Sequence, residues 1–364
     1  MEKIIFYGHL GKKDGEAVGG GESGNLKTLS ILKKSGFQII ELRKSYSSKS
    51  LLGKLKHYLS ILFMPIFLLF KILKNNDVQT VHISGFYKEL IYQELLLIYV
   101  SKLLGKKCIY ELRAGGVQQS YDDRVGFYKF FFRKAITSSD VILVQGERYV
   151  KLLNMLGAKK IIHYPNYIMG SVIARKTSLL NRDNLIELVY FGRMHSSKNI
   201  LLILDICVKL KEKKIPFKLE LIGVSNSKYP EYVEEMREKI KKEKLNDIVK
   251  LTEPIFGSNL INTLKDKHFY IFPTQEAREG HSNSLTEAMS LGIVPICSDY
   301  GFNREIVNSN RLIINEFDAN FYANLIIEIW QQNLWKDLSK DMQEIVSTKF
   351  TSSIVQSKLL AAYK

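Results

Sequence analysis

The sequence predicts an α/β protein with two doubly wound domains, each built on a buried parallel sheet covered by helices. Short apolar runs alternate with longer amphipathic segments, which is typical of strand–helix–strand repeats. The series starts twice, at Lys3 with IIFYG and again at Glu187 with LVYFGR. The chain has 364 residues, more than one hydrophobic core usually supports, so two domains are expected.

Ten apolar runs are candidate strands of the two sheets. They are residues 4–7, 78–83, 108–110, 141–144, 161–163, 188–191, 218–222, 249–251, 269–272 and 294–297. The break between the two series falls in 167–183, where no periodicity is clear. We therefore expect an N-terminal domain at 1–168 and a second domain at 169–345. The segment 318–364 is expected to be helical throughout.

The composition indicates a globular protein with an acidic partner. Apolar content of 46% and charged content of 25% argue against disorder, whereas a net charge of +16 favours nucleic acid, anionic membrane or a phosphorylated ligand. No zinc, RNP or helix-turn-helix pattern supports nucleic acid. Three widely spaced cysteines and the short apolar stretch after Met1 predict a cytoplasmic protein without disulfides or a signal peptide.

Two carboxylates, Glu279 and Glu287, stand out in the stretch 272–307. Glu279 and Gly280 lie in a loop after a strand, and Glu287 lies on the short helix that follows. Carboxylates accept hydrogen bonds from sugar hydroxyls, and a helix N-terminus attracts phosphate. Both residues have simpler interpretations: Glu279 as a surface carboxylate, and Glu287 as the end of a capping box that starts at Ser284.

A basic pair, Arg193 and Lys198, follows the strand 188–191. The pair would project at the carboxyl end of that strand, where open α/β sheets bind ligands. An arginine fork and a lysine charge suit a diphosphate. The alternative is a pair of solvated charges, which is common in a chain with 53 basic residues.

A run of glycines, Gly19-Gly20-Gly21, separates the first strand from a helix expected to begin near Asn25. Glycines there let backbone amides approach an anion closely. The run matches neither the GxGxxG fingerprint nor a P-loop, and a flexible loop is the alternative.

The pattern E-G-x-x-N-x-x-x-E-A-x-x-x-G-x-x-P, from Glu279 to Pro295, resembles that of the retaining glycosyltransferases of family 4. The basic pair, the glycine run, Pro165-Asn166 and the loop 299–307 match other parts of that family's pattern. The resemblance implies the GT-B architecture, with two Rossmann-like domains facing a central cleft. It also implies a C-terminal helix, residues 346–364, that packs back on the N-terminal domain.

The resemblance implies a role for each matched residue. Glu279 would contact the donor sugar, Glu287 the ribose, and Arg193 and Lys198 the diphosphate. The implied donor-binding set also contains Gly19, Gly20, Gly21, Gly280, Asn283, Ser284 and Leu285. Transfer would proceed with retention and without a protein nucleophile. Because no DxD triplet occurs, we expect neither a metal nor another cofactor.

The chain departs from the family's pattern at two places. Many members carry a histidine after the strand that corresponds to 108–110, where this chain reads YELRAGG. Glu111 and Arg113 occupy that place, and His82 on the preceding strand could supply an imidazole or be an ordinary strand-end histidine. These three residues are candidates for the acceptor side. Asn199 stands where the family usually has glycine.

The segment 43–74 contains seven lysines or arginines and no acidic residue, with LSILFMPIFLLF between them. It is interpreted as a basic amphipathic helix on an anionic membrane surface, with a core helix as the alternative. Its uncharged run, 58–70, is too short to span a bilayer and is divided by Pro65.

We therefore expect a peripheral enzyme of the plasma membrane's inner face that uses a lipid-linked saccharide acceptor, as in O-antigen or capsule assembly. A nucleotide-sugar 2-epimerase of the same architecture and a non-catalytic binding protein for lipid or nucleic acid are the alternatives.

Overall fold

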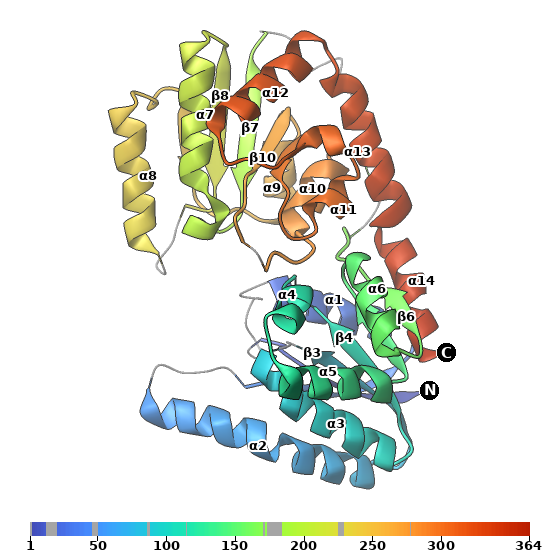
Figure 1. The fold of residues 1–364 in the computed structure, drawn as a ribbon. Helices are drawn as coiled ribbons and strands as arrows, with labels where there is room; N and C mark the ends of the chain where they lie inside the picture. Colours follow the sequence, from blue (N-terminus) through green and yellow to red (C-terminus); the bar gives the residue numbers. More distant parts are fainter. Residues whose placement is uncertain are drawn as a thin grey trace. The chain divides into compact units, whose positions relative to one another are not determined.

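A computed structural model describes residues 2–11, 20–45, 50–85, 88–113, 115–169, 172, 184–224, 229–276 and 278–364. The chain divides into two compact units (Figure 1). Unit 1 comprises Met1–Pro165 together with Val355–Lys364, and unit 2 comprises Asn166–Ile354. Each unit is described by itself.

Unit 1 is built on a parallel sheet of six strands in the order β2-β1-β3-β4-β5-β6. The order reverses between β1 and β3, and ligands of open sheets bind at such points, outside the carboxyl ends of the strands. The strands are β1 (Lys3–Gly8), β2 (Gln38–Arg43), β3 (Val78–Gly85), β4 (Lys107–Leu112), β5 (Val141–Val144) and β6 (Ile161–His163).

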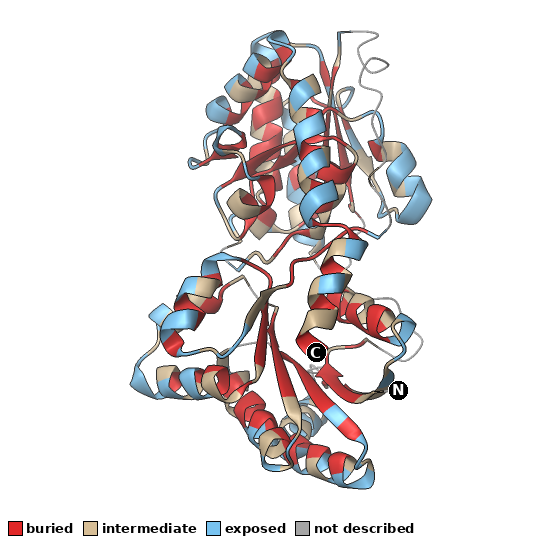
Figure 2. Ribbon diagram, turned by 90° about the vertical axis from the view of Figure 1, so that its right-hand side faces the viewer, coloured by how far each residue is buried: buried red, intermediate tan, exposed pale blue. Residues whose placement is uncertain are grey.

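Unit 2 is built on a second parallel sheet, with the order β12-β11-β10-β7-β8-β9. Its order reverses between β7 and β10. The strands are β7 (Ile186–Phe191), β8 (Phe217–Ile222), β9 (Val249–Thr252), β10 (Phe269–Phe272), β11 (Val294–Ser298) and β12 (Ile313–Ile314). Strand residues are mostly buried in both sheets (Figure 2), as expected for parallel sheets covered by helices.

Helices cover both sheets. In unit 1 they are α1 (Gly20–Lys34), α2 (Leu51–Lys74), η1 (Lys88–Leu90), α3 (Ile91–Leu103), α4 (Val117–Asp122), α5 (Gly126–Ser138) and α6 (Arg148–Leu156). In unit 2 they are η3 (Ser196–Lys198), α7 (Ile200–Glu212), α8 (Pro230–Lys242), α9 (Gly257–Leu264), α10 (Asn283–Ser290), α11 (Asn303–Val307), η4 (Asn310–Leu312), α12 (Ala319–Gln331) and α13 (Trp335–Lys349). The last helix, α14 (Ser352–Tyr363), begins in unit 2 and ends in unit 1.

The structure differs from the sequence-based prediction in several elements and bounds. The C-terminal helix expected at 346–364 is α14, because α13 continues to Lys349. Strands β2 and β12 were not predicted; β2 is a half-buried edge strand without a continuous apolar run, and β12 has two residues. Helix α1 begins at Gly20 rather than near Asn25, so Gly20 and Gly21 are helical residues and not part of a loop.

Helix α2 runs without interruption through Pro65, although the sequence suggested that this proline divides the segment. Proline has no N–H, so the carbonyl of Ile61 loses its helical partner. The side-chain amide of Gln93 on α3 replaces it, because its Nε2 donates to the Ile61 oxygen at 2.9 Å. The Gln93 Oε1 in turn accepts from the Tyr7 hydroxyl at 3.1 Å. By length and composition the resulting helix is long enough to cross a membrane.

The end of α14 completes the core of unit 1. Val355, Leu359 and Tyr363 are buried there. The Tyr363 hydroxyl lies 2.6 Å from Nδ1 of His82 on β3, and Lys160 Nζ donates to the carbonyl of Ala361 at 3.0 Å. These contacts attach the C-terminal residues to the sheet that starts the chain.

Candidate functional site

The loop after β7 carries the basic pair. Gly192 leads into it with φ +145°, and a side chain at Gly223 would lie 2.2 Å from the Gly192 carbonyl, so glycine is required for this close approach. Arg193 is exposed, whereas Lys198 at the end of η3 is buried. Asn199 adopts the left-handed conformation, φ 56° and ψ 44°, before α7 begins. Asparagine tolerates this conformation better than other non-glycine residues, which explains how it replaces the family's glycine.

The loop after β10 brings Glu279 back to the basic loop. The Thr274 hydroxyl donates to the carbonyl of Ser197 at 3.2 Å, and the Gln275 amide donates to the same oxygen at 2.7 Å. The Thr274 hydroxyl also accepts from the Glu276 amide at 3.2 Å. These bonds join the loops that follow β7 and β10, the two strands between which the sheet order reverses.

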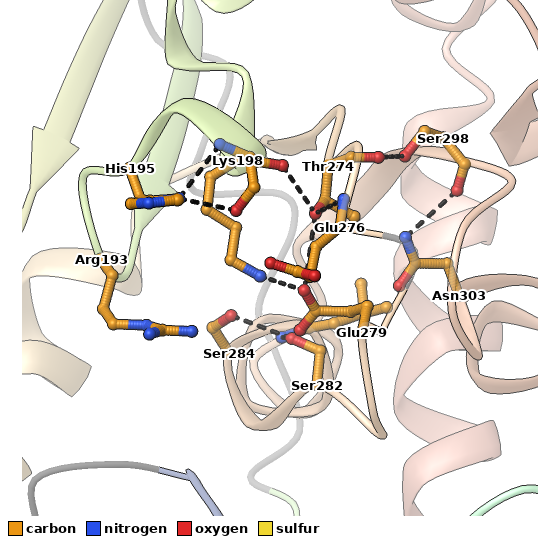
Figure 3. Close-up of polar contacts among 12 residues, drawn as sticks. Arg193, His195, Lys198, Thr274, Glu276, Glu279, Ser282, Ser284, Ser298 and Asn303 are labelled. Carbon is orange, nitrogen blue, oxygen red and sulfur yellow. Dashed lines mark hydrogen bonds and ion pairs between the residues drawn. The ribbon is translucent and has the colours of Figure 1, made fainter. Parts of the chain in front are cut away.

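Lys198 and Glu279 form an ion pair at this point (Figure 3). Only 7% of the Lys198 side chain and 13% of the Glu279 side chain are exposed, so the attraction acts in a medium of low polarity. The Lys198 ammonium also lies 5.5 Å from the centre of the Phe272 ring. The structure therefore joins two residues that lie 81 positions apart and that the sequence placed in one site.

The N-terminus of α10 adds backbone donors beside this pair. The N-cap is Ser282, whose Oγ accepts from the Leu285 amide at 3.3 Å. The amides of Asn283 and Ser284, in the first turn, can bind an anion. Figure 3 shows the Arg193 side chain extending toward Ser284.

The capping box predicted from Ser284 is wrong, because the helix starts two residues earlier. Glu287 is therefore not the third helical residue, and the capping role that competed with ribose binding does not apply to it. Its side chain is half-buried. Gly292 follows the C-cap of the helix, Leu291, with φ +71°, a left-handed conformation that glycine adopts readily.

A third loop, after β11, packs against the Cβ and backbone of Glu279. Gly301 has φ +56°, and a Cβ there would lie 2.4 Å from both the Cβ and the carbonyl oxygen of Glu279. The Ser298 hydroxyl donates to the Thr274 carbonyl at 2.6 Å, and the side-chain Nδ2 of Asn303 donates to the Ser298 carbonyl at 3.1 Å. No role for Thr274, Ser298 or Gly301 was predicted from the sequence. The match of 299–307 to the family's loop was the available signal for Gly301.

Asn166, from the Pro165-Asn166 match, has a defined role in unit 2. Asn166 Nδ2 donates to the carbonyl of His281 at 2.6 Å. The His281 ring packs edge-on against Phe350, with ring centres 4.8 Å apart. Asn166 thus fixes the backbone between Gly280 and the N-cap of α10.

The glycine run belongs to unit 1. Gly19 lies outside the described residues, and Gly20 and Gly21 form the start of α1. Asn25 of α1 donates to the His9 carbonyl after β1 at 2.9 Å and accepts from Ser84 near the end of β3 at 2.8 Å. The N-terminal turns of α1 therefore lie where the strand order of unit 1 reverses.

The three residues assigned to the acceptor side form a buried network in unit 1. His82 lies in the middle of β3, and its Nε2 is 3.0 Å from Glu111 Oε2. Arg113 forms an ion pair with Glu111 and donates to the Thr28 hydroxyl at 3.0 Å. Burial alone would raise the pKa of Glu111, but Arg113 and His82 outweigh it and hold that pKa below its ordinary value. With His82 also bonded to Tyr363, the network attaches α14 to the sheet.

Comparison with known proteins agrees with this geometry. Residues 174–347 match the family model described as glycosyl transferases group 1. The matched range includes the basic pair and both carboxylates. No curated protein sequence matches the chain significantly.

Solved structures match the chain over its whole length. Sucrose-phosphate synthase from Thermosynechococcus elongatus is 16% identical with a TM-score of 0.75, and the match covers 100% of this chain and 98% of that one. A glycosyltransferase from Rickettsia africae is 17% identical, with a TM-score of 0.71 and the same coverage. Anabaena HepE in complex with UDP is 12% identical with a TM-score of 0.70, covering 100% and 99%. The predicted fold is therefore confirmed.

Proposed function

We propose that this chain, a GT-B glycosyltransferase whose residues 174–347 belong to the group 1 family, transfers a sugar from a nucleoside-diphosphate sugar to a lipid-linked saccharide, with retention. The observation that carries the donor assignment is the meeting of Lys198 and Glu279 beside the N-terminus of α10. A cation, a carboxylate and free helix amides at one point suit a ligand with both phosphate and hydroxyl groups.

Each residue of the proposed site binds a different part of the donor. Arg193, Lys198 and the α10 amides bind the diphosphate and stabilise the negative charge that develops as the glycosidic bond breaks. Glu279 accepts hydrogen bonds from sugar hydroxyls, and Glu287 accepts them from the ribose. A uridine diphosphate sugar is the first donor to test, because HepE was solved with UDP and with UDP-glucose.

The basic residues also make a divalent cation unnecessary in this proposal. Arg193 and Lys198 provide the positive charge that a metal supplies in other sites. We expect transfer to continue at an unchanged rate in EDTA. A rate that falls in EDTA and recovers with added magnesium or manganese contradicts this part of the proposal.

The acceptor class is inferred from unit 1. Helix α2 exposes many apolar side chains between lysines, which suits a substrate held at a membrane surface. Retention is proposed on the strength of the family resemblance. The anomeric configuration of the product, measured by NMR, tests it.

Calorimetry against UDP, GDP and ADP, each with and without its sugar, tests the donor site. We expect one nucleoside diphosphate to bind and the Arg193→Ala variant to lose roughly tenfold or more in affinity. Arg237→Ala, on the exposed face of α8, is the matched control. Equal affinities of the wild type and Arg193→Ala for every nucleotide contradict the site. Sugar turnover without any acceptor favours the epimerase instead.

A further inference from the structure

Helix α2 has one packed face and one exposed face. Met64, Pro65, Leu68 and Ile72 are buried, and α2 packs on α3. The opposite face exposes large apolar side chains, namely Leu62, Phe63, Ile66, Phe67, Phe70 and Leu73. Soluble proteins rarely expose so many large apolar residues together without a partner.

Two neighbouring helices also expose apolar side chains. Helix α3 packs between α2 and α5 (Figure 1). It exposes Leu96, Tyr99 and Leu103, which lie on one side of the helix. Helix α5 exposes Phe127 and Phe130. Exposed apolar side chains therefore occur on three successively packed helices and are not confined to the segment that the sequence singled out.

The charges on these three helices have one sign wherever they reach solvent. Helix α2 carries four lysines and no acid, and α5 carries Lys129, Arg133 and Lys134 and no acid. The acidic residue of α3, Glu94, is fully buried, where it pairs with Lys44 at 2.9 Å and accepts from Tyr110 at 2.6 Å. Aromatic rings, aliphatic side chains and basic ends together fit an anionic lipid surface better than a protein partner.

We infer that α2, α3 and α5 form a docking face that lies within the headgroup layer of an anionic bilayer, with α2 parallel to the membrane and not across it. Although α2 is long enough to span, spanning would detach its packed face from α3 and break the bond from Gln93 to the Ile61 carbonyl. Lysines near both ends of α2 can reach the phosphates while the rings between them enter the acyl boundary. This property belongs to unit 1 and is independent of the proposed donor chemistry.

Vesicle sedimentation with the full chain tests the docking face. We expect binding to vesicles of phosphatidylcholine mixed with phosphatidylglycerol, weaker binding to phosphatidylcholine alone, and release at high salt. The triple variant Phe63→Ser, Phe67→Ser, Phe70→Ser should lose roughly tenfold or more in partitioning. The matched control, Phe256→Ser with Phe321→Ser, removes exposed rings from unit 2 and should bind like the wild type.

A second variant pair separates the charge from the apolar surface. Lys54→Glu, Lys56→Glu and Lys74→Glu should weaken binding to the anionic vesicles only, whereas Lys213→Glu, Lys241→Glu and Lys242→Glu on unit 2 should not. UDP affinity, measured in parallel, should be unchanged in all these variants, so a failure of docking is distinguishable from a failure of the donor site.

Three results would overturn the inference. If the triple phenylalanine variant binds vesicles as well as its control does, the membrane contact lies elsewhere on the protein. Protein that resists extraction from vesicles by alkaline carbonate would show a spanning helix. A dimer that the triple variant abolishes, without vesicle binding by the wild type, would show that the face binds a second copy.

Discussion

In the proposed donor site a single carboxylate, Glu279, pairs with Lys198, the lysine assigned to the donor's diphosphate. The two side chains are paired and largely buried. Under the proposed roles, a diphosphate competes with Glu279 for Lys198, whereas a whole donor engages both residues, because its sugar offers hydroxyls to Glu279. The proposed site would therefore favour the donor over the nucleoside diphosphate that transfer leaves behind.

We predict that Glu279→Gln binds the free nucleoside diphosphate about tenfold more tightly than the wild type, because it leaves the Lys198 charge available to phosphate. The same variant should lose sugar transfer by roughly a hundredfold or more. Calorimetry and a transfer assay check the two halves. Glu253→Gln, an exposed change in unit 2, is the control and should alter neither. A lower diphosphate affinity in Glu279→Gln contradicts the competition.

A second residue, His9, makes stability depend on pH. Burial, with the nearby charge of Lys44, lowers the pKa of His9 to about 4, against about 6.5 in an unfolded chain. As the pH falls below 6.5, His9 becomes protonated in the unfolded chain, whereas in the folded protein it stays neutral until about pH 4. The unfolded state therefore binds more protons in this window, and the free energy of unfolding decreases as the pH falls from 6.5 to 4.

Denaturant midpoints of the wild type and His9→Asn between pH 7.5 and pH 4.5 check this. The variant should lose less stability on acidification. Carboxyls with lowered pKa values, such as Glu111 and Asp140, act at lower pH and are common to both proteins. Parallel curves for the two proteins would show that His9 is not responsible.

At the scale of elements, α2 depends on one side chain from another helix. Gln93→Leu leaves the Ile61 carbonyl without its donor and should destabilise unit 1 by about 1–3 kcal/mol. Pro65→Ala restores a backbone N–H at that place, so Gln93→Leu should be less damaging in that background. A double-mutant cycle by chemical denaturation measures this coupling. Additive effects would mean that Gln93 acts through Tyr7 alone.

Elements could be predicted where the physical signal is local. Buried parallel strands are mostly apolar, so β7 and β10 could be predicted from the sequence, as could the basic pair and Glu279 that follow them. Contacts across the fold left no such signal. The amide that rescues Pro65 lies 32 positions from the carbonyl it bonds, and the need for Gly301 arises from a loop on another strand. The burial of His82 and Glu111 likewise depends on α14, from the far end of the chain.

At the scale of the whole molecule, the two units differ in which parts of the chain form them. Unit 2 is one continuous stretch, whereas unit 1 needs residues 355–364 to complete its core. Those ten residues place Val355, Leu359 and Tyr363 among the buried side chains, and Tyr363 bonds the buried His82. Without these ten residues, His82 and its neighbours become exposed to water or lose hydrogen-bond partners. The loss of folding free energy is therefore larger than for a truncation at the surface.

We therefore predict that residues 166–354 alone fold cooperatively and bind the nucleoside diphosphate, whereas residues 1–165 alone do not unfold cooperatively. Joining 355–364 to the end of 1–165 through a flexible glycine-serine linker should restore a cooperative transition, measured by circular dichroism in denaturant. The same fusion with Leu359→Ala and Tyr363→Ala is the control and should behave like 1–165. Equal transitions for 1–165 with and without the segment would show that α14 only covers a unit that is already stable, so the folding of unit 1 would not have to wait for the end of the chain.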